Sequence, residues 1–174
     1  CDNQENVELV WDGNYIMVHH FEEISGTRFD STVNHFNGAP SNVVHNNVGV
    51  IDGADNFNGA SSFLSLGTSS VLQPLVGTIS VWLNASAVSG IRTIFTGSTG
   101  GTVRRHPYLR IYNGNLQFVI TNNVAEEWHF GSTPVSINKD YFVTVTWDGS
   151  TTVLYVDGVA VDSETQIITP VGNT

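Results

Sequence analysis

Short runs of alternating apolar and polar residues dominate the second half of the chain. The clearest occupies Tyr141–Asp162, where Tyr141–Trp147, Val153–Val156 and Val159–Val161 are separated by Asp148-Gly149 and Asp157-Gly158. Alternation with a period of two is typical of strands with one buried face, and Asp-Gly supplies the positive φ angles that a two-residue hairpin loop needs. The pattern predicts three antiparallel strands joined as a meander.

A further hairpin is predicted upstream, where Asn113-Gly114 joins Tyr108–Tyr112 to Leu116–Ile120. No stretch longer than a turn repeats apolar residues at helical spacing. The 174 residues are enough for one domain with a substantial core and too few for two comfortable ones. We therefore expect an all-β fold, a two-sheet antiparallel β-sandwich with at most one short helical turn.

Four segments resemble, in order, the motifs of laminin-G-like domains, the jelly rolls of the concanavalin A-like type. These segments are His19–Asn34, Ala54–Leu64, Gly77–Leu83 and Tyr141–Ser163. The resemblance covers residues 16–163 and implies a jelly roll in which Trp82 is the inward tryptophan of its strand. Alternation places Trp82 and Trp147 in the predicted core, together with Phe57, Phe63 and Phe142.

The two ends of the chain depart from this resemblance. Residues 1–15 precede the jelly-roll motifs as a tether, and residues 16–174 form the domain, which lacks the family's usual closing strand. Val7–Tyr15 alternates well enough to be an extra strand. Three alternatives are open. Val7–Tyr15 takes the place of the missing closing strand in its own subunit, or it is donated to a neighbouring subunit with Leu9 and Trp11 as buried anchors. In the third alternative, the sequence is a fragment without its last strand.

The only cysteine, Cys1, precedes the polar run Asp2–Asn6. This resembles the start of a mature bacterial lipoprotein, in which the thiol carries a lipid anchor. The alternative is an arbitrary boundary left by processing. A single cysteine excludes a disulfide within the chain, so the domain depends on its core for stability.

Calcium is the cofactor that the resemblance implies, at the loop after the first strand. Asp30 would contribute its carboxylate, Asn34 and His35 would contribute oxygens, and Asp55 would come from a neighbouring turn. Calcium needs six to eight oxygen ligands, so several turns must converge. The alternative is that Asp30 only forms an Asx-turn.

Sixteen acidic residues against six Lys and Arg give a formal charge of −10, which disfavours nucleic acid as a partner. No apolar run is long enough to span a membrane. These properties fit an extracellular or cell-surface location. The densest positive charge lies at Arg104 and Arg105, close to Tyr108, and with Trp128 these residues form a candidate site for a glycan, including an acidic polysaccharide. Alternatively, the arginines pair with surface acids and Trp128 belongs to the core.

The sequence does not favour an enzyme. It has no Glu-x-Asp-x-Glu pattern, and adjacent carboxylates such as Glu22 and Glu23 would point to opposite faces of a strand. Its six histidines lack the spacing of a zinc site. We expect a non-catalytic structural or adhesive subunit of a cell-surface assembly, with strand exchange between copies of itself or with surface-protein subunits as one way of building it. The alternative is a carbohydrate-binding module.

Overall fold

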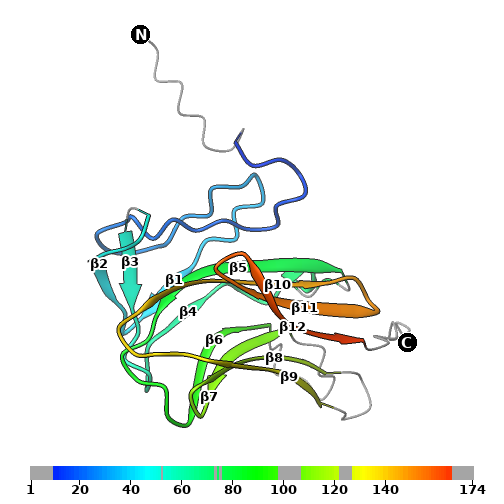
Figure 1. The fold of residues 1–174 in the computed structure, drawn as a ribbon. Helices are drawn as coiled ribbons and strands as arrows, with labels where there is room; N and C mark the ends of the chain where they lie inside the picture. Colours follow the sequence, from blue (N-terminus) through cyan, green and yellow to red (C-terminus); the bar gives the residue numbers. More distant parts are fainter. Residues whose placement is uncertain are drawn as a thin grey trace. The chain divides into compact units, whose positions relative to one another are not determined.

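The computed structural model describes residues 10–51, 53–72, 74, 76–97, 107–121 and 127–165, with the side chains of 46, 120, 121 and 127–130 excepted. The chain forms two compact units, Cys1–Val71 and Leu72–Thr174. Within the described ranges it contains antiparallel strands and one short 3-10 helix, Ser70–Leu72 (Figure 1). The strands are β1 (Ala39–Ser41), β2 (Val44–Val48), β3 (Gly53–Asn56), β4 (Phe63–Ser65), β5 (Gly77–Asn84), β6 (Ile91–Thr96), β7 (Tyr108–Tyr112), β8 (Asn115–Thr121), β9 (Glu127–Pro134), β10 (Asp140–Trp147), β11 (Thr151–Val156) and β12 (Val159–Thr165).

The second unit is a sandwich of two four-stranded antiparallel sheets. One sheet has the strand order β12-β11-β10-β5, and the other has the order β6-β7-β8-β9. The two sheets lie as separate layers in Figure 1. This arrangement confirms the predicted all-β, two-sheet sandwich.

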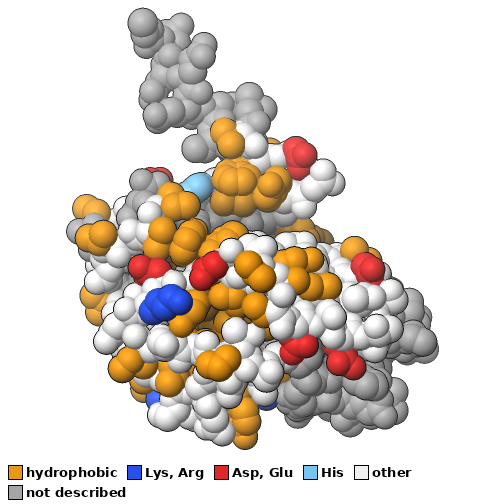
Figure 2. Space-filling model, in the orientation of Figure 1, with side chains coloured by type: hydrophobic (Ala, Val, Ile, Leu, Met, Phe, Trp, Pro, Cys, Tyr) orange, Lys and Arg blue, Asp and Glu red, His pale blue; other side chains and the backbone are white. Residues whose placement is uncertain are grey.

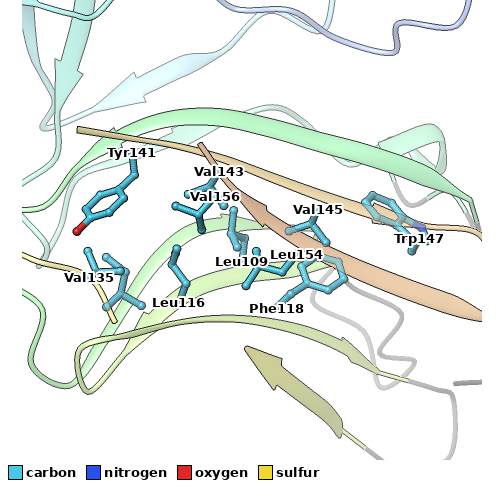
Figure 3. Packing of buried hydrophobic residues seen from close by; sticks show 11 residues of the cluster. Leu109, Leu116, Phe118, Val135, Tyr141, Val143, Val145, Trp147, Leu154 and Val156 are labelled. Carbon is cyan, nitrogen blue, oxygen red and sulfur yellow. The ribbon is translucent and has the colours of Figure 1, made fainter. Parts of the chain in front are cut away.

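The core of the second unit lies between these sheets. Side chains from both layers point toward one another, with Phe118 stacked on Trp147 at 5.6 Å between ring centroids (Figure 3). The buried cluster comprises Leu109, Ile111, Leu116, Phe118, Val135, Tyr141, Val143, Val145, Trp147, Leu154 and Val156. Trp147 also donates its indole N–H to the Pro74 carbonyl at 3.0 Å, so this partly polar side chain is satisfied inside the core.

The predicted meander and hairpins are confirmed. Asp157 and Gly158 both have positive φ, 51° and 80°, and so do Asn113 and Gly114, 48° and 88°. These are the angles that let a two-residue loop follow the twist of its strands. Asp157 also accepts a hydrogen bond from the Phe142 amide through its carboxylate, at 2.9 Å, which ties the β11–β12 turn to β10.

The placement of Trp82 differs from the prediction. On β5 the side chains of Ile79, Val81 and Leu83 pack against the core, so strand alternation turns Trp82 to the outer face, where it is 43% exposed. It lies 5.1 Å from the Phe142 ring on the same outer face. The expectation that Trp82 and Phe142 are core residues is therefore wrong, whereas Trp147, 4% exposed, is one.

Phe57 and Phe63, in the first unit, are also wrongly assigned to the core. Phe57 directly follows β3, Phe63 begins β4, and they are 44% and 56% exposed; each of these strands belongs to a sheet of only two strands. The strands of these sheets pair as β1-β4 and β2-β3. On the face drawn in Figure 2, exposed hydrophobic side chains are common and charged side chains are scattered.

The resemblance implies a first strand before the loop of Asp30, but the residues there do not form one. Residues 16–23 carry no strand assignment, and Arg28 pairs with Gly38 through an isolated bridge. The segment 16–23 nevertheless runs close to β3. The approach is so close that a Cβ added at Gly53 would collide with the Phe21 carbonyl oxygen.

The expected N-terminal strand also differs from the structure where it is described. Residues 10–15 form a turn, in which the Asp12 carboxylate accepts a hydrogen bond from the Asn14 amide at 2.9 Å. Trp11 packs edge-on against the Tyr15 ring at 4.8 Å and is half-buried in this turn. Leu9, the other expected anchor, lies outside the described residues. Strand exchange through these residues stays a prediction, as does the domain boundary at residue 15.

Candidate functional site

The outer face of β7 carries a row of alternating aromatic and cationic side chains. Leu109 and Ile111 are 0% and 2% exposed, and they fix the inner face of the strand. The intervening residues Tyr108, Arg110 and Tyr112 therefore share the outer face. The guanidinium carbon of Arg110 lies over both tyrosine rings, 5.3 Å from the centroid of Tyr108 and 5.0 Å from that of Tyr112.

The neighbouring strands hold this row in place. Gln117 on β8 stands opposite Arg110, and its Oε1 accepts hydrogen bonds from Nε at 3.2 Å and Nη2 at 3.0 Å. Thr93 on β6 faces Arg110 from the other side, and its hydroxyl lies 3.0 Å from that of Tyr108. We call Tyr108, Arg110, Tyr112, Gln117 and Thr93 the tyrosine–arginine cluster.

The tyrosine–arginine cluster combines the groups that bind sugars. Tyrosine rings offer apolar faces, while hydroxyl, amide and guanidinium groups offer directional hydrogen bonds. Tyr112 is 40% exposed, so part of its ring is open to a ligand. Because the cluster rests on three paired strands of the β6–β9 sheet, its geometry is fixed before any ligand arrives, which lowers the entropy cost of binding.

Sequence reasoning finds only one member of this cluster. Tyr108 is a predicted ligand-binding residue, and the structure places it on β7 beside Arg110. Arg104 and Arg105 lie outside the described residues. Trp128 lies on β9, where its backbone pairs with Ile120, and its side chain is not described. The signal for Arg110 is the Tyr-x-Arg-x-Tyr spacing inside an alternating strand, which puts the three side chains on one face.

Asp30, the first of the residues predicted to bind calcium, has both carboxylate oxygens engaged in hydrogen bonds. Its carboxylate, in a residue that is 6% exposed, accepts four hydrogen bonds. The amides of Val18 and Thr32 donate to Oδ1 at 2.9 and 3.0 Å, and the Thr32 hydroxyl and the Phe36 amide donate to Oδ2 at 2.9 and 2.8 Å. These donors occupy the lone pairs that a cation would need.

Hydrogen bonding also sets the charge state of Asp30. Burial raises the pKa of its carboxyl, but the hydrogen bonds from Val18, Thr32 and Phe36 act in the other direction and outweigh burial, so the pKa lies below its usual value. The ionised carboxylate therefore holds the loop that runs from Asp30 to Phe36, together with the backbone at Val18.

Asp55 is committed to Arg28. Both carboxylate oxygens of Asp55 lie 2.7 Å from the guanidinium, one at Nε and one at Nη2, and Arg28 is 0% exposed. The His45 ring also contacts both residues of this pair. Glu23 contributes a further carboxylate 3.6 Å from Nη1 of Arg28. Asp55 thus neutralises a buried cation, which is a structural role.

Asn34 and His35 do not complete a calcium site. The Asn34 amide nitrogen donates to the carbonyls of Tyr15 and Ile16, at 3.1 and 3.0 Å, and His35 forms a tight turn with a φ of 52°. Among the residues that the structure describes, no three His, Cys, Asp or Glu side chains are grouped to hold a metal ion. The arrangement of Asp30, Asn34, His35 and Asp55 does not fit a calcium ion.

The family is identified from the sequence of the second unit together with the residues just before it. Residues 52–174 match the sequence profile described as the concanavalin A-like lectin/glucanases superfamily. The chain belongs to this superfamily. A comparison with curated proteins found no match.

Solved structures with the same fold include surface and receptor-binding domains. A domain of an S-layer domain-containing protein from Clostridium thermocellum superimposes with a TM-score of 0.57 at 20% identity, over 88% of this chain and 74% of that one. The receptor binding domain of botulinum neurotoxin C/D mosaic serotype gives 0.63 at 17% identity, over 87% of this chain. The binding domain of botulinum neurotoxin DC in complex with SialylT gives 0.61 at 17% identity. This chain spans 39% of each toxin domain, and these similarities show the fold.

Proposed function

We propose that this chain is a non-catalytic glycan-binding module of an extracellular or cell-surface protein. The tyrosine–arginine cluster would be its binding site. In the part of the chain that the structure describes, no helix is long and apolar enough to cross a membrane.

The observation that carries this proposal is the position of Arg110 between two tyrosine rings on the outer face of β7. A packing role would put such aromatic side chains into the core, but the core side of β7 is already filled by Leu109 and Ile111. Stacked aromatic and hydrogen-bonding groups on a rigid sheet are well suited to sugars. The fold similarity to receptor-binding domains is consistent with a binding role.

A glycan array tests the proposal. Wild-type protein should bind a subset of glycans, and Tyr112→Ala should weaken binding at least tenfold, because it removes an open ring face without touching the core. Ser150→Ala, on the loop between β10 and β11, is the control and should bind like the wild type. Failure of the wild type to bind any glycan would refute the proposal, and so would unchanged binding by Tyr112→Ala.

A structural or adhesive subunit of a cell-surface assembly is the second candidate. One observation favours it: β12 is an end strand of its sheet, and its Val159 and Val161 are 63% and 41% exposed. Apolar side chains on an end strand favour pairing with another chain. Light scattering with and without EDTA checks this candidate. An oligomer would support strand exchange, and a monomer unaffected by EDTA would exclude both exchange and a calcium-dependent contact under these conditions.

A further inference from the structure

We infer that this chain binds a second copy of itself through the outer edge of β5, with the two β5 strands paired antiparallel about a two-fold axis at Val81. The β12-β11-β10-β5 sheets of the two copies would then form one continuous sheet. This interface lies in the sheet that does not carry the tyrosine–arginine cluster, so the inference does not depend on glycan binding. It follows from the edge of β5, from its sequence and from the burial of its inner side chains.

β5 is an end strand with a long and regular edge. In the part of the chain that the structure describes, it pairs only with β10, over eight consecutive residue pairs without a shift in register. In an antiparallel pair, every second residue directs its N–H and C=O to the same side, so alternate residues of β5 direct theirs away from β10. Such an edge is a template for a further strand.

The other three end strands of the two four-stranded sheets carry features that oppose such pairing. β6 contains Arg92, β9 contains Glu127, and β12 contains Asp162 and Glu164 beside its exposed valines. The pairing of each of these strands with its neighbour is also interrupted by a register shift. Charges and bulges are common means of keeping end strands apart. β5 has neither, so among these strands it is the best suited to self-pairing.

The inner side chains of β5 are less buried than the residues opposite them on β10. Val143 and Val145, which face Val81 and Ile79, are 0% exposed, whereas Val81 and Ile79 are only partly buried. The described sheet ends at β5, so these side chains have a neighbouring strand on one side only. A further strand would cover them, and the removal of apolar surface from water favours association.

The sequence of β5 makes a second copy a suitable occupant. Residues directly opposite each other in an antiparallel pair lie on the same face, so pairing about Val81 sets this residue against its own copy and sets Ile79 against Leu83. On the outer face, Ser80 meets Trp82. Apolar side chains therefore meet on the inner face, and no pair brings two charges together. This matters because the formal charge of −10 makes two copies repel each other at long range.

Sedimentation equilibrium of the whole chain over a concentration series measures the association. The wild type should form a dimer, and added salt should tighten it, because salt screens the repulsion between two acidic copies. Hydrogen exchange of the β5 amides that point away from β10 should slow as the protein concentration rises. A monomer throughout the series overturns the inference. So does protection of these amides that is independent of concentration, since the edge would then be covered within one chain.

Two matched serine variants identify the strand. Ser80→Glu adds a carboxylate to the exposed face of β5, and the two carboxylates of a dimer would lie near each other across the axis, so dimerisation should weaken by about tenfold or more. Ser163→Glu adds the same charge to an exposed serine of β12, the opposite end strand, and should change dimerisation by less than about twofold. A dimer that survives Ser80→Glu, or that Ser163→Glu disrupts, overturns the inference. Thermal melts check that both variants are folded.

A cysteine cross-link tests the register without a disruptive substitution. In the Cys1→Ser background, Val81→Cys should form a disulfide between two copies when oxidised glutathione is added, because position 81 faces itself across the axis. Ser80→Cys is the control, since its two copies lie diagonally and should cross-link far less. A covalent dimer formed by Val81→Cys in preference to Ser80→Cys supports the inference. Equal cross-linking of the two variants, or none by Val81→Cys, overturns it.

Discussion

Replacement of Asp30 by asparagine is the sharpest test of how the first unit is held together. The change keeps the size of the side chain but turns one carboxylate oxygen into an NH2 group. The oxygen of the new amide could still accept hydrogen bonds from two of the four donors. Its NH2 group would face the other two donors, and a donor cannot accept their hydrogen bonds. Asp30→Asn should therefore remove at least two hydrogen bonds and leave their donors buried without acceptors.

The expected loss follows from the number of these bonds. A hydrogen bond to a charged group contributes about 1.5–3 kcal/mol, so the loss of two should lower the free energy of unfolding by about 3–6 kcal/mol. Because the pKa of Asp30 is lowered in the folded state, the stabilisation is present above its unfolded pKa, near 3.8, and is lost as the pH falls through the folded value. Asp30→Asn should lose this part of the acid dependence.

Hydrogen exchange is the suitable assay, since the chain has two units and one unfolding transition need not report both. The amides of Val18, Thr32 and Phe36 should lose most of their protection in Asp30→Asn. Asp12→Asn is the control, because it makes the same chemical change in an exposed turn and should cost less than about 0.5 kcal/mol. If Asp30→Asn lowers the free energy of unfolding by less than about 1 kcal/mol, well under the cost of two charged hydrogen bonds, this account of Asp30 is refuted. It is also refuted if calcium increases the hydrogen-exchange protection of the Asp30–Phe36 loop in the wild type.

Three further predictions concern other described residues. Trp147→Ala should destabilise the second unit by about 3–5 kcal/mol, while Trp82→Ala, on the outer face, should cost less than about 1.5 kcal/mol in the same urea titration. Burial lowers the pKa of the His19 imidazole, whose Nδ1 is buried without a hydrogen-bond partner and whose Nε2 contacts the Phe36 carbonyl oxygen. Protonation of His19 should therefore destabilise this region, so the hydrogen-exchange protection of the Phe36 N–H should fall as the pH drops below 6.5. His19→Gln should flatten this pH profile. Gly131→Ala should lower the thermal midpoint, because the φ of Gly131 is 103° and the new Cβ would lie 2.5 Å from the Leu116 carbonyl oxygen. Gly13→Ala is the control: its Cβ would meet no neighbouring atom, so the thermal midpoint should not change. Equal melting of the two variants would contradict the steric argument.

The features of the fold that depend on local rules are predictable from the sequence. The hairpins at Asn113-Gly114 and Asp157-Gly158 are recognisable because two consecutive positive φ angles demand these residues. The buried position of Trp147 follows from strand alternation. Trp82 is misplaced because the prediction gives its aromatic character more weight than the alternation of its strand, in which Ile79, Val81 and Leu83 share one face and Trp82 shares the other with Ser80 and Asn84.

The candidate site is harder to predict for the same reason. Tyr108 and Arg110 are two residues apart, but their relation to Gln117 and Thr93 depends on the register of β7 with β8 and β6. The calcium prediction rests on the resemblance to laminin-G-like domains and on residue types, without knowledge of the contacts that these residues make. The type of Asp30 agrees with calcium, yet its four hydrogen-bond donors come from backbone and side-chain groups whose approach a sequence pattern does not reveal.

On β7, stability and binding are assigned to alternate residues, and this separates the two experimentally. Leu109 and Ile111 are buried against the opposite sheet, so their replacement by alanine should lower stability by about 2–5 kcal/mol. Tyr112 and Arg110 lie on the other face, so their replacement should change binding with little effect on stability. If Tyr112→Ala destabilised the chain as much as Ile111→Ala does, the outer row would be a packing surface, and the argument for a glycan site on β7 would fail.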